Sequence, residues 1–332
     1  MGIGIALIAV LGLIVLAYVG TDILGLHAIF GIAFPYAAFL IFIIGFIYRV
    51  IKWARSPVPY RIPTTAGQYY GSLGFKQNKI DNPSTALGVA VRMFFEVFAF
   101  RSLFRNTKAE LLKGRLYIGS SKWLWLGAIA FHYCFLIIFL RHMRFFTPKT
   151  PWLISGIESI DSFLQIHVLG SPLLYITNVV IALALLYLLG RRILDSKLRY
   201  LSLPSDYFPL FLIIGIITTG ILMRYFFKVD ITKAKELTLG LVYLNPSVPE
   251  GVGSLFYIHL FLVSCLFAYF PFSKLMHMAG VFLSPTRNLA NNNRMKRHVN
   301  PWEYPVTHRH YEEYEDEFRD KMKKAGIPLE KE

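Results

Sequence analysis

The stretch Ser121–Arg144, SKWLWLGAIAFHYCFLIIFLRHMR, decides how the rest of this sequence is interpreted. It is apolar and longer than the roughly 20 residues that a helix needs to cross a bilayer. His132 lies in its middle and His142 near its end, and an imidazole in hydrocarbon is costly enough to indicate a function. Ten residues of helix separate the two rings by about 15 Å along the axis. This spacing predicts two cofactors stacked across a membrane.

A second apolar segment supplies two further histidines. Ser254–His277 reads SLFYIHLFLVSCLFAYFPFSKLMH and carries His259 and His277. Their separation corresponds to about five whole turns of an α-helix. If the segment is one unbroken helix, both imidazoles lie on the same face.

The composition indicates an integral membrane protein. The 332 residues are 55% hydrophobic and only 17% charged, and the mean hydropathy is +0.48, which is too apolar for a soluble domain of this length. The net charge of +15 does not indicate nucleic acid, because the basic residues cluster at the ends of apolar runs, where lipid headgroups and topology explain them. The two cysteines, Cys134 and Cys265, provide no disulfide framework and no set of four thiolates for an iron–sulfur cluster.

The hydrophobic runs predict an all-α integral membrane protein with a six-helix transmembrane bundle in the cell membrane. The six predicted spans are Ile3–Val19, Ile29–Val50, Lys122–Arg141, Pro172–Leu189, Tyr207–Phe226 and Leu255–Met276. With a cytoplasmic N-terminus, 28 of the 35 basic residues fall on the inner side. The excess of Lys and Arg in cytoplasmic segments therefore predicts that both termini are cytoplasmic.

The segments between and after the spans divide the chain further. We expect residues 1–27 to form an extra N-terminal span with an outer turn, 28–283 the haem-binding membrane domain, and 284–332 a cytoplasmic tail. Within the cytoplasmic segment 51–121, Ala86–Arg105 alternates phenylalanine with charge and predicts an amphipathic helix. The pattern fits a helix in the headgroup layer and a helix that docks a soluble partner equally well. In the tail, the acidic-to-basic order of Tyr311–Lys324 predicts a short helix.

The four span histidines are paired by depth. The third and sixth spans are antiparallel, which places His142 and His259 toward the outer side and His132 and His277 toward the inner side. Two bis-histidine haems b held between two helices need this arrangement, so we predict that these four histidines ligate haem iron. The pairing is imperfect, because the two levels are about 15 Å apart on one helix and about 27 Å apart on the other, so tilt would have to absorb the difference.

Neighbouring residues suggest how the cofactors are accommodated. Gly127 lies near the inner histidine of the third span and would let a porphyrin approach the backbone. Arg141, Arg144 and Lys274 are candidate partners for haem propionates, although interfacial snorkelling also explains such cations. His167, in the outer loop, is a candidate proton acceptor for a quinol, with an ordinary surface histidine as the alternative.

Histidines ten residues apart on one span and eighteen apart on a later one resemble the membrane cytochrome b subunit of respiratory nitrate reductases, the gamma subunit family. The resemblance covers about the last five spans. The extra first span, the proline-rich cytoplasmic segment and the tail sequence Asn300–Pro305, NPWEYP, depart from that pattern. With these additions the chain is similar to the cytochrome b subunits of heterodisulfide-reductase-like menaquinol-oxidising complexes of the DsrMKJOP type, which are associated with sulfite reduction.

The resemblance implies a function and a set of partners. Menaquinol would be oxidised in the membrane, and two haems b would pass the electrons to a cytoplasmic iron–sulfur subunit (DsrK-like) in dissimilatory sulfur metabolism. Terminal reduction would occur on that partner chain, and further membrane and extracytoplasmic redox subunits would complete the complex. Carried over to this sequence, His142 and His259 would hold the outer haem, and His132 and His277 the inner one.

Two other functions remain open at this point. A proton-coupled transporter could use the histidines as a relay, but no Asp or Glu lies within the last four predicted spans to complete such a pathway. A cofactor-free membrane anchor would have no use for histidine pairs at matching depths. A visible spectrum distinguishes all three, because reduced bis-histidine haem has a sharp absorption band.

Overall fold

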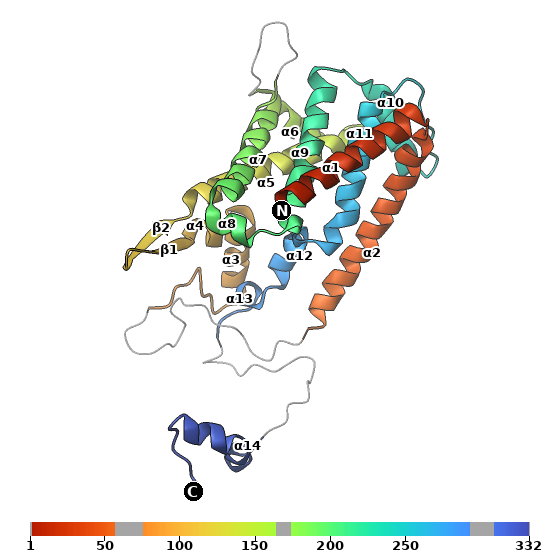
Figure 1. Ribbon diagram of the computed structural model, residues 1–332. Helices are drawn as coiled ribbons and strands as arrows, with labels where there is room; N and C mark the ends of the chain where they lie inside the picture. The colour runs from red at the N-terminus through yellow and green to blue at the C-terminus, as the bar shows by residue number, and fades with distance from the viewer. Residues whose placement is uncertain (1, 57–75, 164–173, 293–308, 332) are drawn as a thin grey trace.

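The computed structural model describes residues 2–56, 76–163, 174–292 and 309–331 (Figure 1). Within these ranges six helices are long and apolar enough to cross a membrane, as the sequence predicts. They are Gly2–Ile23, Ile29–Ala54, Lys122–Phe145, Ile176–Leu194, Pro204–Tyr225 and Ser254–Phe272. Their order agrees with the predicted spans, and the boundaries differ by a few residues. The fifth begins earlier than predicted, so Asp206 lies in its first turn.

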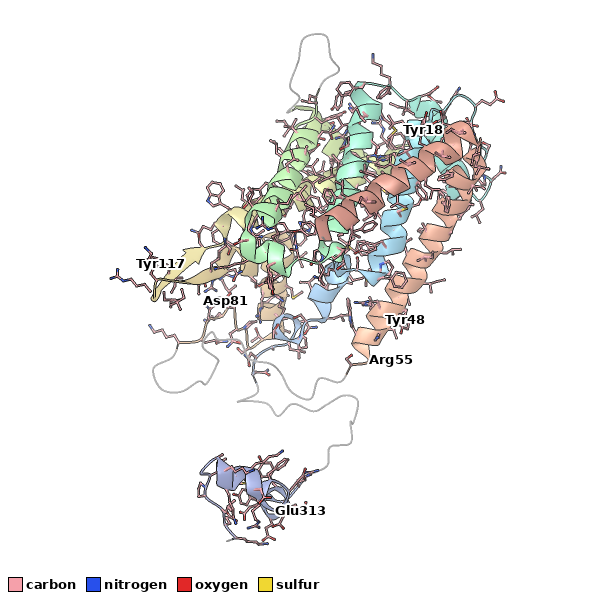
Figure 2. All side chains as sticks on the ribbon, viewed as in Figure 1. Tyr18, Tyr48, Arg55, Asp81, Tyr117 and Glu313 are labelled. Atoms are coloured by element: carbon pink, nitrogen blue, oxygen red, sulfur yellow. The ribbon has the colours of Figure 1, made fainter. Side chains whose placement is uncertain are left out.

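The first two spans contain π-helical turns where they approach each other. Helix α1 (Gly2–Tyr18) continues into η1 (Val19–Ile23), and η2 (Ile29–Ala33) continues into α2 (Phe34–Ala54). Figure 2 marks this pair, with Tyr18 at the end of α1 and Arg55 at the far end of α2. The remaining spans are built on α5 (Lys122–His142), α7 (Ile176–Leu194), α9 (Pro204–Tyr225) and α11 (Ser254–Tyr269).

Helix α11 lies at the centre of the bundle. Its Tyr257 and Leu262 are almost completely buried, and it packs against α2, α9 and α1. Helix α5 is held mainly by α7 instead. Helix α5, with His132 and His142, and helix α11, with His259, therefore belong to different packing groups of one bundle.

The sixth span does not reach His277 as one helix, so the prediction that His259 and His277 share a helical face is wrong. Helix α11 ends at Tyr269, and the short 3-10 turns η4 (Phe270–Phe272) and η5 (Lys274–Met276) follow. Pro271 has no N–H to continue the helix, and Ser273 is extended, with φ −115° and ψ 177°. His277 begins a separate short helix, α12 (His277–Gly280), followed by η6 (Val281–Leu283) and α13 (Pro285–Asn288).

The segment before α5 is more divided than predicted. The expected helix over Ala86–Arg105 is two helices, α3 (Ala86–Phe98) and α4 (Arg101–Arg105), separated at Phe100, whose φ is +49°. An antiparallel hairpin of β1 (Thr107–Leu112) and β2 (Arg115–Ser120) follows, and the sequence analysis did not predict it. Its two-residue turn, Lys113-Gly114, has positive φ at both positions, as a tight hairpin turn needs. Figure 1 shows the hairpin extending away from the bundle beside α4.

Short helices connect the spans. They are α6 (Trp152–Phe163), α8 (Ser196–Leu201) and α10 (Ile231–Val242), and the 3-10 turn η3 (Met143–Phe145) ends the third span. Near the C-terminus, α14 (Tyr311–Lys324) confirms the predicted tail helix with the same bounds. The chain after α14 returns to it, because the buried Glu315 carboxylate accepts the main-chain N–H groups of Glu330 and Lys331 at 2.7 and 3.0 Å.

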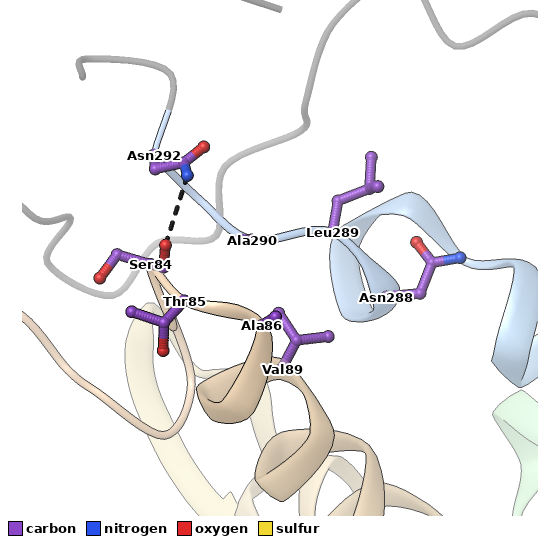
Figure 3. A pocket seen from close by; sticks show the side chains of 8 residues that line it. All are labelled: Ser84, Thr85, Ala86, Val89, Asn288, Leu289, Ala290 and Asn292. Carbon is purple, nitrogen blue, oxygen red and sulfur yellow. Dashed lines mark hydrogen bonds between the residues drawn. The ribbon is translucent and has the colours of Figure 1, made fainter. Parts of the chain in front are cut away.

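Residues 284–292 pack against the segment that contains α3. Asn291 is buried; its main-chain N–H donates to the Pro83 carbonyl at 2.7 Å and its side-chain amide donates to the Asn82 side chain at 2.5 Å. Asn292 donates to the Ser84 carbonyl at 3.3 Å, at the shallow pocket between α3 and α13 that Figure 3 shows. The chain after the last span is therefore joined to the loop between the second and third spans.

Candidate functional site

The structure brings the four span histidines together as two pairs. The ring centres of His142 on α5 and His259 on α11 are 6.4 Å apart, with ring planes 18° from parallel. The ring centres of His132 on α5 and His277 on α12 are 5.9 Å apart, with nearly perpendicular planes at 83°. These are the pairs that antiparallel third and sixth spans predict. The chain breaks after α11, and His277 thereby lies opposite His132. The mismatch in depth that one continuous helix would have produced is avoided.

Both separations suit two imidazoles on opposite sides of one metal ion. A metal–imidazole bond is about 2 Å long and the ring centre lies roughly 1 Å beyond the nitrogen, so the two ring centres should be about 6 Å apart. Among the described residues no group of three or more His, Cys, Asp or Glu side chains could hold a metal. Pairs of this kind therefore suit a metal whose remaining ligands come from a macrocycle, as in haem.

Three of the four histidines have Nδ1 bonded to a main-chain carbonyl. His132 donates to the Ala128 carbonyl and His142 to the Ile138 carbonyl, both at 2.7 Å and both one turn earlier in α5. His277 donates to the Lys274 carbonyl at 2.9 Å. A carbonyl only accepts, so Nδ1 carries the proton and Nε2 keeps a free lone pair. Histidines that ligate metals are usually oriented in this way.

The fourth histidine is oriented by a side chain that the sequence analysis missed. The Thr219 hydroxyl of α9 lies 2.9 Å from His259 Nδ1. It also lies 2.9 Å from the carbonyls of Gly215 and Ile216, which can only accept its proton. The hydroxyl oxygen is therefore left to accept from Nδ1–H, which again frees Nε2. Next to Thr219, a Cβ at Gly220 would lie 3.5 Å from the His259 ring. Thr218-Thr219-Gly220 in an apolar span was the available signal, but it carries information only once α9 is known to face α11.

The inner pair is flanked by aromatic side chains. Phe100 and Phe131 both lie nearly perpendicular to the His132 ring, with ring centres 5.1 and 5.0 Å away. Phe100 reaches this position from the turn between α3 and α4, where it adopts a left-handed backbone conformation. Such a conformation is unfavourable for a bulky residue and persists only where surrounding contacts hold it.

Arg141, a predicted propionate partner, lies in a cluster of its own. Its guanidinium forms an ion pair with the buried Asp161 of α6, and the Thr177 hydroxyl donates to the same carboxylate at 2.9 Å. Its guanidinium carbon also lies 3.8 Å from the centre of the Tyr175 ring. The buried Nε of Arg141 has no hydrogen-bond partner within the described ranges. Arg141, which directly precedes His142, therefore has one N–H that the cluster does not use.

The other two predicted cations also have carboxylate partners. Arg144 pairs with Glu158 of α6, and Lys274 Nζ lies 2.5 Å from Asp206 at the start of α9. Neither contact tests a role in propionate binding, so that role stays a prediction for both.

The last two predicted site residues are less closely tied to the pairs. A Cβ on Gly127 would come within 2.6 Å of the Tyr187 ring of α7, so close packing of α5 on α7 is enough to require glycine there. A role of Gly127 in accommodating a porphyrin stays a prediction. His167 lies outside the described residues.

Comparison with known proteins places the chain in a family. The model of the nitrate reductase gamma subunit family matches residues 91–297, a range that contains both histidine pairs. The chain is 46% identical over 277 residues to a protein of Archaeoglobus profundus named Hdr-like menaquinol oxidoreductase cytochrome b-like subunit, covering 82% of each chain. It is 44% identical over 282 residues to the protein of the same name from Archaeoglobus fulgidus, covering 83% of each chain.

Proposed function

This chain belongs to the nitrate reductase gamma subunit family, and we propose that it is the dihaem cytochrome b subunit of a menaquinol-oxidising complex. In this proposal it takes electrons from menaquinol in the membrane and passes them to a cytoplasmic iron–sulfur subunit. The names of the two Archaeoglobus relatives support the menaquinol and the cytochrome b parts of the proposal. The extension to sulfur metabolism and to a DsrK-like partner rests on the resemblance in sequence.

The observation that carries the proposal is the pair of facing imidazoles at each of two levels. Each pair has the separation that one iron atom needs, and each of the four rings has its Nδ1 engaged by an oxygen. A histidine that served only packing would have no reason to keep Nε2 free beside a second histidine. Two haems b would supply one-electron carriers at these two levels.

In this proposal the residues of this chain would hold the two haems, orient the histidine ligands and neutralise a carboxylate. Nε2 of each histidine would bind iron, while the Nδ1 hydrogen bond fixes the tautomer and the plane of each ring. The free N–H of Arg141 can donate to a carboxylate near the outer pair. We propose His167 as the acceptor of a quinol proton, on the outer side that the distribution of basic residues assigns.

The electrons must leave through another chain. With only two cysteines, Cys134 and Cys265, both unpaired, this chain cannot hold an iron–sulfur cluster with four thiolate ligands. With both termini cytoplasmic, most basic residues face the cytoplasm, where they favour a partner with an acidic surface. Further membrane and extracytoplasmic redox subunits belong to the same proposal.

The proposal is tested by haem content. We expect the purified chain to contain two haems b per polypeptide by the pyridine haemochrome assay, and both to be reduced by a menaquinol analogue. One haem per chain would contradict the two-pair assignment. A preparation with no haem band after expression under haem-replete conditions would favour the transporter or the anchor.

Thr219 gives a second test that leaves every proposed ligand in place. Thr219→Val keeps the shape of the side chain and removes the oxygen that accepts from His259 Nδ1. Because that hydrogen bond raises the basicity of the imidazole, its loss should raise the midpoint potential of one haem and weaken haem retention by about tenfold. Potentiometric titration and haem loss to apomyoglobin would measure the two effects.

Ser264→Ala is the matched control. Ser264 is also buried in α11, but within the described part of the chain its hydroxyl bonds to the Leu260 carbonyl alone, at 2.8 Å. Its removal should leave both potentials unchanged. Equal shifts in the two variants would show that Thr219 acts through general packing.

A further inference from the structure

The polarity of α3 is inverted relative to a helix in water. Leu87, Val91, Phe94 and Phe98 have exposed fractions of 76%, 41%, 57% and 53%. Their spacing of four, three and four residues forms one continuous stripe along the helix, here called the α3 stripe. On the other side Arg92 is only 6% exposed. A helix that exposes its phenylalanines and buries its arginine is suited to apolar surroundings.

The polar side chains of α3 face the protein. Glu96 pairs with Arg287 of α13 at 3.7 Å and accepts from the main-chain N–H and the hydroxyl of Ser102 at 3.2 and 2.5 Å. These contacts join α3 to α4 and to the chain that follows the last span. The large apolar side chains of the α3 stripe are directed away from these contacts.

The C-terminal end of α3 is fixed against a membrane span. The Tyr133 hydroxyl donates to the Phe98 carbonyl and Trp125 Nε1 donates to the Ala99 carbonyl, both at 2.8 Å. Tyr133 lies eleven residues beyond the start of α5, which is about 16 Å along the span, and its side chain leans back toward the N-terminus of that helix. This end of α3 therefore lies level with the inner part of α5.

The same hydrogen bonds satisfy backbone groups that lipid could not satisfy. The last carbonyls of a helix have no partner within the helix. In water they can bond to solvent, but in hydrocarbon each needs a donor from the protein. At the end of α3, the donors are two aromatic side chains of α5, Trp125 and Tyr133, a residue pairing that suits a membrane interface.

The α3 stripe also continues an apolar surface that the bilayer must cover. Tyr133 is 41% exposed beside Phe98, and Leu126 and Leu136 of the same span are 47% and 48% exposed. Because α5 is long and apolar enough to cross the membrane, lipid is the expected surrounding of these side chains.

We propose that α3 is embedded in the inner interfacial layer of the membrane, with the α3 stripe in contact with lipid acyl chains. The occupant is lipid because the stripe adjoins the lipid-facing side of α5 and because α5 satisfies the terminal carbonyls. The proposal does not depend on haem binding. It assigns a seventh membrane-contacting helix to the chain and places it directly before Phe100, which covers His132.

The proposal can be tested with nitroxide labels on single cysteines. The full chain, with Cys134 and Cys265 replaced by alanine, is reconstituted in nanodiscs after labelling of Phe94→Cys. Leu136→Cys on α5 serves as the lipid-facing control, and Tyr314→Cys on α14 as the water-facing control. We expect the label at 94 to collide several-fold more often with oxygen than with a water-soluble nickel chelate, as at 136. Ready collision with nickel, as at 314, would overturn the proposal.

A second measurement uses the unmodified chain, so it does not depend on folding of the variants. Photoactivation of lipids with a diazirine in the acyl chain, followed by peptide mapping, should give adducts within residues 86–98 and none within 311–324. Absence of adducts in 86–98, together with adducts in α5, would contradict the proposal. Adducts that disappear only when the iron–sulfur partner is bound would identify the α3 stripe as a protein dock instead.

Discussion

Replacing His142 or His259 with alanine should remove one and the same haem, and replacing His132 or His277 should remove the other. The reason is that the two rings of each pair lie close together, with ring centres 6.4 Å apart in the first pair and 5.9 Å apart in the second. Each single variant should therefore fall from two haems per chain to one, and the two variants within a pair should lose the same spectral component in a redox titration. The double variant His132→Ala/His142→Ala should bind no haem.

His27→Ala is the control for this series. The His27 ring packs against the ring of Tyr257, with centres 5.0 Å apart in a tilted arrangement, and His27 belongs to neither histidine pair. This variant should keep both haems and both potentials. If His132 and His259 variants lost the same component, both the pairing and the assignment of depth would be wrong.

Deleting residues 309–332 should weaken capture of the proposed iron–sulfur partner by at least about tenfold, or about 1.4 kcal/mol of binding free energy. The deletion removes α14, an exposed helix with acidic residues in its first turn and three lysines in its last. It removes no span and none of the paired histidines, so haem content and haem reduction by quinol should be preserved. Co-purification at moderate salt, with haem per chain measured in parallel, tests both statements.

A longer deletion is the control for this experiment. A chain that ends before Asn291 also loses the hydrogen bonds from Asn291 to Pro83 and Asn82. It should therefore unfold at a lower temperature, whereas the shorter deletion should not. Full-stoichiometry capture by the shorter chain would exclude α14 as the dock and transfer the role to residues 76–122.

Much of the fold could be predicted because the bilayer imposes a simple rule on sequence. The number and order of the spans follow from the lengths of the apolar runs, and the pairing of histidines follows from the antiparallel directions of two spans. The helix break before His277 was missed because its signal, Pro271, also occurs inside continuous membrane helices. Indeed α9 continues through Pro209.

Other features depend on tertiary contacts that no local pattern contains. Thr219 supports His259 from a different helix, and an isolated threonine in an apolar span is ordinarily bonded to its own backbone. The hairpin is formed by Thr107–Leu112 and Arg115–Ser120, which lack the long alternation of apolar and polar residues that would predict strands. For α3, the sequence predicts amphipathicity but not which side faces the protein.

Because the helix breaks after α11, the two histidine pairs differ in how easily one ring can be displaced relative to the other. Both members of the outer pair belong to long, continuous helices, so displacing either ring means shifting a whole span. In the inner pair, His277 belongs to the short α12, and the chain beyond it leads through α13 to the contact between Arg287 and Glu96 of α3. A displacement of α13 can therefore reach the His277 ring without deforming the bundle, whereas moving either ring of the His142–His259 pair requires moving a whole span.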